Sequence, residues 1–435
     1  MANILFVTLE ETGHLTPTYP LARSLRDRGH AISYLPFAET AEGLAQASSQ
    51  IEAAGFSAHA IPYEAYGEVF ATPRGPLRAF REMQGWRRLR DRFVSKVGLL
   101  VTQLSAARPF DLVIVDSMMS PAHLVLAATG FRAALFSTNL FFKNPGPWST
   151  PPYIPGTQAW RIRRAKANAL DWWRYRFLRG LAMPLTAKAF RAFDRARRDP
   201  FTGFIEIVLC PREFEFPLAE PHPHRVYVGP SIDLERPADP DFPWSRLEGG
   251  PIIYAAFGTM TGSYGKSVAL VRRALIDAAA RRPAWRVLLV GGDSDDVPPN
   301  VVVVPKAPQI EVLSRANVMV THAGLNSVKE CIFFGVPMIA IPQAWDQIGN
   351  ASRLTFHGLG LASSVSRCTA DSLSAMLDEV LANSMYRERV ARMKEIFRRA
   401  ETDELAARAV ERALSAPIDG VAEMLSIWRP SPVSS

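Results

Sequence analysis

Residues 306–347 read KAPQIEVLSRANVMVTHAGLNSVKECIFFGVPMIAIPQAWDQ and predict one strand–loop–helix–strand unit. A short β-branched strand at 318–320 leads through a loop to a helix that begins near Asn326, and a second strand follows at 338–341. In an open parallel sheet, ligands bind beyond the carboxyl ends of the strands. The helix start supplies free backbone N–H groups and the positive end of the helix dipole, which suits a phosphate. The polar residues of the unit fall at this edge, and they are His322, Asn326, Ser327, Asp346 and Gln347.

Composition indicates a globular protein with two domains. The chain has 435 residues, of which 48% are hydrophobic and 21% are charged, and this suits a large core. Its cysteines, Cys210, Cys331 and Cys368, are too few and too widely spaced for a disulfide framework, which favours a reducing compartment. The first strand lacks the basic head of a signal peptide, and no apolar run reaches transmembrane length. We therefore expect a cytoplasmic protein.

The net charge of +8 is concentrated in two basic segments that also carry aromatic residues. Residues 74–96 hold eight basic and two acidic residues, and residues 160–198 hold twelve basic and two acidic residues. Solvated amphipathic helices are one interpretation. The other is peripheral attachment of these Arg-rich segments to the inner face of an anionic membrane. No nucleic-acid-binding module accompanies the charge, so we expect no nucleic-acid partner.

Strand and helix patterns alternate twice along the chain. The first series opens with a strand at 4–9, a helix at 17–28 and a strand at 31–35, and a second series starts with a strand at 252–257. Prolines crowd the region between the two series, as in a linker. We predict an α/β protein with an N-terminal Rossmann-like domain at 1–232, a proline-rich linker at 233–247, a C-terminal Rossmann-like domain at 248–415, and a tail at 416–435 that could pack back on the N-terminal domain.

The quoted stretch resembles the donor-binding signature of the nucleotide-sugar glycosyltransferases of the UDP-glycosyltransferase type, family 1, which include bacterial natural-product and macrolide enzymes. The resemblance implies the GT-B fold, in which two Rossmann-like domains with parallel sheets face a central cleft. The first domain would bind the acceptor and the second the donor. Residues 40–105 and 145–200 contain no matching motif. The matching elements are Ala307-Pro308-Gln309, the run HAGLNS at 322–327, Glu330, Gly335, Pro337, Pro342 and Asp346-Gln347.

Roles for the donor-side residues follow from this resemblance. It implies that Glu330 accepts hydrogen bonds from the ribose hydroxyls, and that Gln309 approaches the base chiefly through its backbone. Lys306 stands where a tryptophan is common, which leaves the base open between uracil and thymine. The implied diphosphate contacts are His322, Gly324, Asn326 and Ser327, with Gly258 and Thr259 as further phosphate-side contacts, and the implied sugar contacts are Asp346 and Gln347.

His14 is the candidate general base. It follows the first strand in the predicted loop 10–14, and a lone histidine at such a position is more often structural than catalytic. The run GHLTP at 13–17 resembles the Gly-His-x-x-Pro element of the family, which implies that His14 takes the proton of the acceptor hydroxyl. Asp116, at the end of its strand, resembles the partner acid that would orient the imidazole. Asp111, at the other end of that strand, is expected to be dispensable.

Two other motifs are interpreted as structural, and neither a metal nor a cofactor is expected. The acidic run DSDD at 293–296 has Asp-x-Asp spacing but reads as a solvated turn. The tripeptide GKS at 265–267 lacks the first glycine of a P-loop, because Met260 stands there. His222 and His224 have no nearby ligands and are assigned to the linker.

The sequence therefore predicts an inverting, metal-independent glycosyltransferase. It would move a hexose, with glucose as first choice, from UDP to a hydroxyl of a small hydrophobic acceptor. Three alternatives remain open: an epimerase or hydrolase acting on nucleotide sugars with the same fold, a non-catalytic nucleotide-sugar-binding protein, and a membrane-associated lipid or terpenoid glycosyltransferase.

Overall fold

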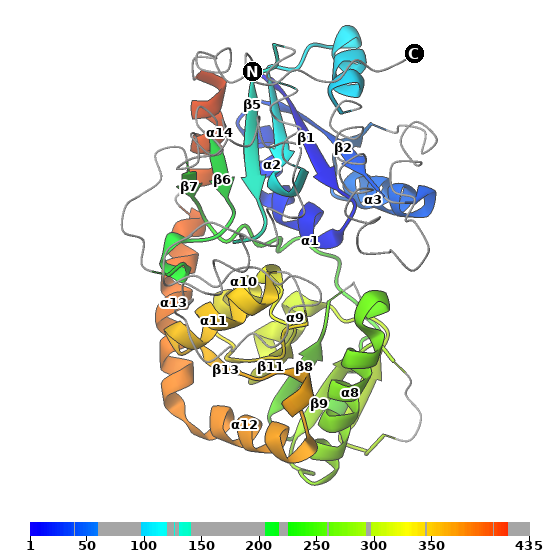
Figure 1. The fold of residues 1–435 in the computed structure, drawn as a ribbon, viewed down its shortest axis with the longest axis vertical. Helices are drawn as coiled ribbons and strands as arrows, with labels where there is room; N and C mark the ends of the chain where they lie inside the picture. Colours follow the sequence, from blue (N-terminus) through cyan, green and yellow to red (C-terminus); the bar gives the residue numbers. More distant parts are fainter. Residues whose placement is uncertain are drawn as a thin grey trace, which may run out of the picture.

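Two parallel β-sheets with helices on both faces form the two halves of the molecule, and Figure 1 shows one above the other. The predicted α/β class is confirmed. The computed structural model describes residues 1–38, 40–59, 97–119, 126, 130–140, 205–216, 225–258, 261–292, 297–343, 346–402 and 404–415.

The first sheet has seven strands in the order β3-β2-β1-β4-β5-β6-β7, and each neighbouring pair is parallel. The strand order reverses beside β1, so that β1 and β4 are neighbours although they are far apart in sequence. Such a reversal opens a crevice at the carboxyl ends of the two strands. The strands are β1 (Asn3–Leu9), β2 (Ala31–Phe37), β3 (Ser57–Ala58), β4 (Leu112–Asp116), β5 (Ala133–Ser137), β6 (Glu206–Val208) and β7 (Arg225–Tyr227).

Alternation along β1 divides the first half into two cores. Ile4 and Phe6 pack on one face with α2, while Leu5 and Val7 pack on the other, and all four side chains are fully buried. A parallel strand covered on both faces needs apolar residues at every position, which explains the continuous run ILFVTL. Among the described residues of this half, the helical elements include α1 (Thr12–Leu15), η1 (Thr16–Thr18), α2 (Tyr19–Asp27), α3 (Ala41–Ala53), η4 (Ser117–Met119) and η5 (Arg212–Phe214), and residues 97–107 are helical as well.

The second sheet has six parallel strands in the order β10-β9-β8-β11-β12-β13. Here the order reverses between β8 and β11, where Gly258 and His322 follow the strands. The strands are β8 (Ile252–Ala256), β9 (Arg286–Val290), β10 (Val301–Val304), β11 (Val318–Thr321), β12 (Met338–Ala340) and β13 (Gly360–Ala362). The helical elements are η6 (Trp244–Leu247), α8 (Thr261–Ala280), α9 (Gln309–Arg315), α10 (Leu325–Phe334), α11 (Gln347–His357), η7 (Val365–Arg367), α12 (Ala370–Ala382), α13 (Ser384–Thr402) and α14 (Leu405–Ser415).

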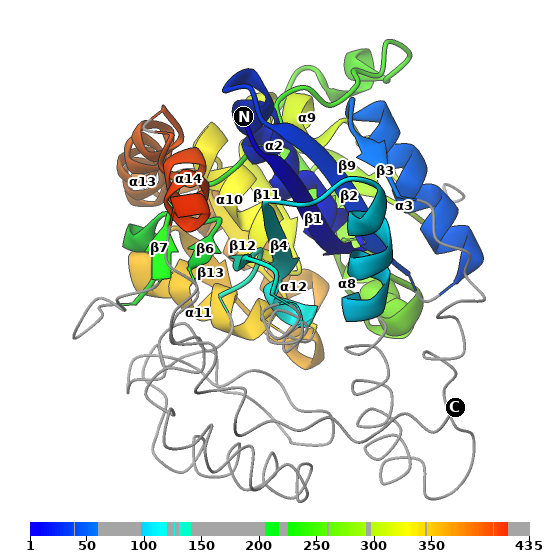
Figure 2. The same ribbon diagram turned by 90° about the horizontal axis from the view of Figure 1, so that it is seen from above.

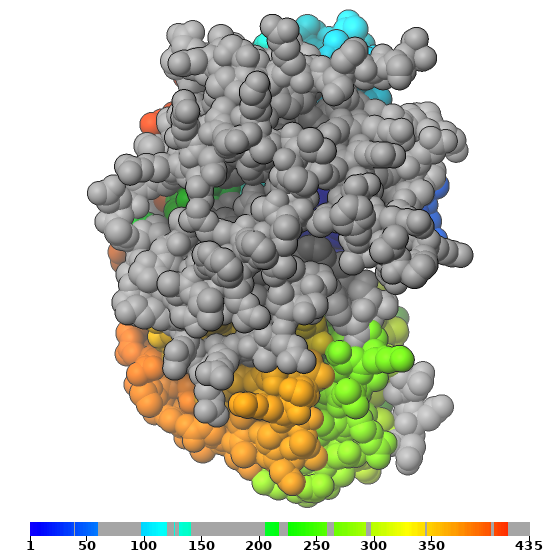
Figure 3. Space-filling view, viewed as in Figure 1, coloured from blue at the N-terminus to red at the C-terminus, as the bar shows by residue number. Residues whose placement is uncertain are grey.

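Helices α8 and α12 cover the outer face of the second sheet. Ile253 and Ala255 of β8 pack in the same cluster as Leu275 of α8 and Leu377 of α12. Figure 3 shows both helices at the surface of the lower half, α8 in green and α12 in orange. The opposite face, which includes Tyr254, packs against α9, α10 and α11.

The GKS tripeptide lies inside α8, where its backbone is helical and forms no P-loop.

Helices α13 and α14 return the chain to the first half, and Figure 2 shows them close together beside β6. Ala407 and Val410 of α14 are buried in the same core as Ile4 and Phe6. Residues 405–415, which the sequence analysis assigned to the C-terminal domain, therefore pack in the first half. The apolar face of α14 contacts α2 and β5, and this packing explains why α14 lies in the first half. The predicted tail 416–435 lies outside the described residues.

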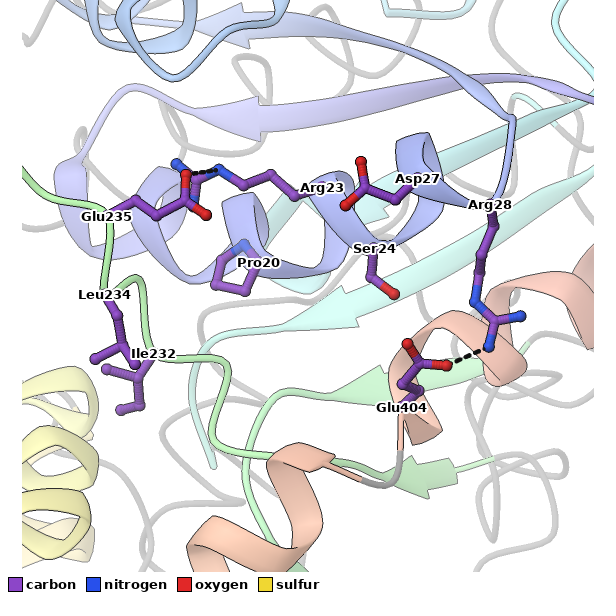
Figure 4. A pocket seen from close by; sticks show the side chains of 9 residues that line it. All are labelled: Pro20, Arg23, Ser24, Asp27, Arg28, Ile232, Leu234, Glu235 and Glu404. Atoms are coloured by element: carbon purple, nitrogen blue, oxygen red, sulfur yellow. Dashed lines mark hydrogen bonds and ion pairs between the residues drawn. The ribbon is translucent and has the colours of Figure 1, made fainter.

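An irregular connector, residues 229–243, joins the two halves and is pinned to α2. Arg23 of α2 donates to Asp233 over 2.7 Å and pairs with Glu235 over 3.0 Å. The Ser231 hydroxyl donates to the carbonyl of Pro17 over 2.6 Å. A pocket of about 510 Å³ lies between α2, the connector and the start of α14, and Figure 4 shows Glu404 and Arg28 closing one end of it.

Local structure around His14 differs from the prediction. His14 lies in the helix α1, not in a loop, because the backbone N–H groups of His14 and Leu15 both bond to the carbonyl of Glu11. The basic segments 74–96 and 160–198, Thr259 and the acidic run 293–296 lie outside the described residues. Within the described ranges, no helix has the length and apolar character needed to cross a bilayer.

We predict that Phe397→Ala will lower the free energy of unfolding by about 3–5 kcal/mol, because the ring is fully buried and its loss leaves a cavity. Phe397 of α13 meets the edge of Phe214, with ring centroids 6.4 Å apart, and so joins the two halves. Urea unfolding measures the change. Met385→Ala on the exposed side of the same helix should change it by no more than about 0.5 kcal/mol. Equal effects of the two substitutions would contradict the packing described for α13.

Candidate active site

The carboxyl ends of the two sheets meet between the halves of the molecule. Helix α1, which follows β1, lies at the edge of the upper half that faces α9 and α10 in Figure 1. The Asn326 side-chain amide in the first turn of α10 donates to the carbonyl of Gly13 over 2.7 Å. One hydrogen bond thus joins the start of the donor-side helix to the residue before His14. Asn326 is one of the residues predicted to contact the diphosphate.

His14 and Asp116 form the predicted pair. The Nδ1 atom of His14 lies 2.6 Å from Oδ2 of Asp116, whose side chain is fully buried. The other carboxylate oxygen accepts the backbone N–H of Met118 over 2.8 Å, which fixes the carboxylate plane. Thr138 Oγ1 lies 3.1 Å from the same His14 nitrogen. Because Nδ1 is engaged by the carboxylate, Nε2 is the ring nitrogen that can receive a proton from a bound molecule.

Carboxylates raise the pKa of His14 to about 9. Burial alone would lower the pKa, but the charge and hydrogen bond of Asp116 outweigh it, and Glu11 and Asp346 raise it further. Asp346 belongs to the second half, so its charge acts on the histidine across the interface between the halves. The candidate base and a residue predicted to hold the sugar are therefore electrostatically coupled.

His322 lies between two glycines at the carboxyl end of β11. A Cβ atom on Gly258 would lie 2.8 Å from Nε2 of His322, and one on Gly324 would lie 2.5 Å from it. Gly258 also has a φ angle of +77°, which side-chain-bearing residues rarely adopt. Both predicted donor-side glycines therefore make room for the imidazole.

Burial lowers the pKa of His322 to about 4, although a hydrogen bond to the backbone of Ala256 opposes the shift. The ring is consequently neutral near pH 7 and brings no positive charge to an anion. Three buried polar atoms at this interface have no hydrogen-bond partner among the described residues: Glu11 Oε2, His322 Nδ1 and Asn326 Oδ1. Such atoms are rare in native proteins, and they fit a site that binds a polar ligand.

Glu330 lies one turn further along α10 and is buried. Its Oε1 atom accepts from Arg236 of the connector, and its Oε2 atom accepts from the side-chain amide of Gln309. The amide oxygen of Gln309 in turn accepts the Tyr254 hydroxyl over 2.9 Å. The side chain of Gln309, which was predicted to contribute mainly its backbone, is thus part of a buried network.

Asp346 and Gln347 stand at the start of α11. Burial raises the pKa of Asp346, while a hydrogen bond from Asn350 and the charges of His14 and Arg353 oppose the shift. Asn350 donates to Asp346 over 2.9 Å and to the carbonyl of Ala323 over 3.0 Å, which ties α11 to the loop before α10. The amide oxygen of Gln347 accepts the backbone N–H of Gln343 over 2.8 Å.

The structure brings most of the predicted residues to this interface. Ser327 lies in the first turn of α10 and is partly buried. Among the residues that the structure describes, no group of three or more His, Cys, Asp or Glu side chains could hold a metal ion. Sequence reasoning missed Thr138, Arg236, Tyr254 and Asn350. Thr138 could have been found, because it directly follows the strand beside Asp116.

Comparison with known proteins identifies related enzymes. A family model described as "UDP-glucoronosyl and UDP-glucosyl transferase" matches residues 245–410. Demethyllactenocin mycarosyltransferase of Streptomyces fradiae is 27% identical over 95% of this chain and 87% of its own length. Zeaxanthin glucosyltransferase of Pantoea ananas is 25% identical over 92% of this chain and 93% of its own length.

The fold is shared with a solved glycosyltransferase. The crystal structure of the calicheamicin glycosyltransferase CalG4 superposes with a TM-score of 0.69 at 22% identity, and the match covers 96% of this chain and 100% of that one. The predicted GT-B arrangement of two Rossmann-like halves is thereby confirmed.

We predict that the His14 imidazole will titrate near pH 9 in an NMR experiment. Folding then favours the protonated ring, so its contribution to stability is complete below the unfolded pKa of about 6.5 and is lost as the pH rises through about 9. Asp116→Asn should bring the pKa of His14 to 6.5 or below, because burial lowers this pKa and the carboxylate that raises it most is then absent. An unchanged titration in this variant would refute the assigned pairing.

His322 should show the opposite dependence. Because folding favours its neutral form, its contribution to stability is complete above about pH 6.5 and is lost as the pH falls through about 4. The stability difference between wild type and His322→Gln, measured by urea unfolding, should therefore change between these two pH values. A difference that stayed constant down to pH 4 would show that His322 accepts a proton readily in the folded protein.

Proposed function

The chain belongs to the UDP-glycosyltransferase-type, family 1 glycosyltransferases, and on this premise we propose that it transfers a hexose from a UDP-sugar to a hydroxyl of a small hydrophobic acceptor. Glucose is the sugar we favour. The family model names UDP-sugar transferases, and one relative is named for glucose and zeaxanthin. Another relative is named as a mycarosyltransferase, so the identity of the transferred sugar is the first point to test.

The observation that carries this proposal is the position of the His14–Asp116 pair opposite the donor-side residues. Nδ1 of His14 is bonded to Asp116, and Asp346 acts on the same ring from the other half. An acceptor hydroxyl at Nε2 would then face a sugar held at the start of α11. A protein that only bound nucleotide sugars would have no need of a base in this position.

The proposed reaction is a single displacement. Nε2 of His14 takes the proton of the acceptor hydroxyl while its oxygen attacks the anomeric carbon, and the bond from that carbon to the diphosphate oxygen breaks. Asp116 stabilises the imidazolium that forms. The configuration inverts, and the nucleoside diphosphate leaves.

The departing charge would be met by dipoles at the start of α10. The backbone N–H groups of the first turn have no partner within their helix, and the helix dipole places positive potential there. These groups are held in place before the reaction, which is the arrangement that stabilises developing charge best. We therefore propose that transfer is independent of a metal ion.

We expect wild-type protein to form glycosides when a panel of hydroxylated apolar acceptors is offered UDP-glucose, UDP-galactose and deoxythymidine-linked hexoses, with products detected by mass. Product formation should persist in EDTA. With a productive pair, kcat/KM should rise with pH and level off above an apparent pKa of about 9, because only the neutral imidazole accepts a proton.

His14→Ala and Asp116→Asn should each lower kcat by a factor of about 10²–10⁴, as expected for loss of a general base or its partner. Asp111→Asn is the matched control at the other end of β4. Asp111 accepts the backbone N–H of Asn3 over 2.7 Å, and asparagine retains an acceptor oxygen, so turnover should stay within about twofold.

The alternatives predict different outcomes. A hydrolase would release the free sugar without an acceptor, and an epimerase would convert UDP-glucose into UDP-galactose. If UDP bound and no donor gave any glycoside, the transferase proposal would be wrong. Full turnover in both His14→Ala and Asp116→Asn would overturn the mechanism and leave the fold unaffected.

A further inference from the structure

Arg236 of the connector lies at the centre of a buried polar network that the proposed mechanism does not use. Arg236 donates from Nη2 to one oxygen of Glu330, and Gln309 donates to the other. Tyr254 of β8 completes the chain through its bond to Gln309. Four elements of the fold, β8, α9, α10 and the connector, thus meet at one carboxylate.

The carboxylate is buried deeply enough to need a cationic partner. The side chain of Glu330 is 3% exposed, and removing a carboxylate from water is costly unless a charge or hydrogen bonds compensate. Arg236 supplies both. Lys329 also acts on this region, but its Nζ atom donates to the carbonyl of Leu209 over 2.8 Å. Among the residues that the structure describes, Arg236 is therefore the cation that contacts Glu330 directly.

The network leaves room for a ligand. A carboxylate offers about four acceptor positions, and the protein contacts just described use one on each oxygen, so a ribose diol can be added. The Nε atom of Arg236 is buried and has no hydrogen-bond partner among the described residues. The arginine side chain as a whole is 30% exposed and is therefore accessible from the surface of the site.

The connector places Arg236 by its attachment to the first half. Glu235 and Asp233 both pair with Arg23 of α2, and Figure 4 shows Arg23 reaching from α2 to Glu235. The carboxylate of Glu401 on α13 accepts the backbone N–H of Ser231 over 2.8 Å. The guanidinium that meets α10 is thus held by elements that belong to the other half of the molecule.

We propose that Arg236 is a donor-positioning residue, which holds the Glu330 carboxylate in place to accept the ribose hydroxyls of the nucleotide sugar. The inference rests on the proposed function, because it takes the ribose as the group that Glu330 binds. It adds that the connector between the halves, and not only the donor-binding half, sets how well the ribose is held.

Binding of UDP and of 2′-deoxyuridine diphosphate, measured by calorimetry, tests this assignment. Wild type should bind UDP more tightly, because only UDP offers the full diol. Arg236→Met should weaken UDP binding by about tenfold or more, in line with loss of a charged hydrogen-bond partner, and weaken the 2′-deoxy nucleotide by less than about threefold. Arg236→Lys should fall between wild type and Arg236→Met, since lysine keeps the charge but not the planar fork.

Asp239→Asn is the matched control. Asp239 is an exposed residue of the same connector that accepts the backbone N–H of Asp241 over 3.2 Å, and it is not one of the residues that tie the connector to α2 and α13. Both nucleotides should bind to this variant within about twofold of wild type, and thermal unfolding should confirm that each variant is folded.

Equal weakening of both nucleotides by Arg236→Met would show that Arg236 only braces the connector, and unchanged binding would show that it plays no part. Either result would overturn the inference while leaving the transferase proposal intact. Failure of wild type to bind UDP at all would overturn the inference and the assignment of UDP as the donor nucleotide. Glycoside formation from a different nucleotide sugar would then show that the protein is still a transferase.

Discussion

The buried ion pair between Arg353 and Glu215 holds the two halves in the register on which the site depends. Its partners are 3% and 0% exposed, and the guanidinium of Arg353 also lies over the ring of Phe216. Such a pair adds little net stability, yet it is costly to break, so it selects one arrangement of the halves. Asp346 lies seven residues before Arg353, two turns back on the same face of α11. The helix that this pair anchors therefore also carries Asp346, which raises the pKa of His14.

Helix α10 also connects the two halves of the molecule. Three neighbouring residues of one face reach the rest of the molecule: Asn326 bonds to Gly13, Lys329 bonds to Leu209, and Glu330 bonds to Arg236 of the connector. These contacts make the helix that carries the predicted phosphate site part of the interface as well. A change in how the halves meet must then alter the predicted donor contacts, even when no donor-side residue is changed.

Sequence patterns predicted the framework because parallel strands are strongly apolar and end at polar residues. The strand 133–137 and the ends of β4 and β11 were found in this way, whereas the pairing of His14 with Asp116 was expected from the resemblance to the glycosyltransferase family. The patterns could not show that His14 lies in a helix, because α1 is a single turn that begins after Glu11. They also could not place α14 or Arg236, since both depend on surfaces created by residues far away in the sequence.

The two histidines show why placement matters more than residue type. His14 and His322 are both removed from water, and burial disfavours the charge on each. His14 meets Asp116, Glu11 and Asp346, and its pKa rises, whereas His322 meets glycines and a backbone carbonyl, and its pKa falls. Asp116 and Glu11 lie in the same half as His14, whereas Asp346 acts on the ring from the opposite half with the smallest effect of the three. The basicity of the proposed catalytic group is therefore set mainly within the first half, and the opposite half adjusts it.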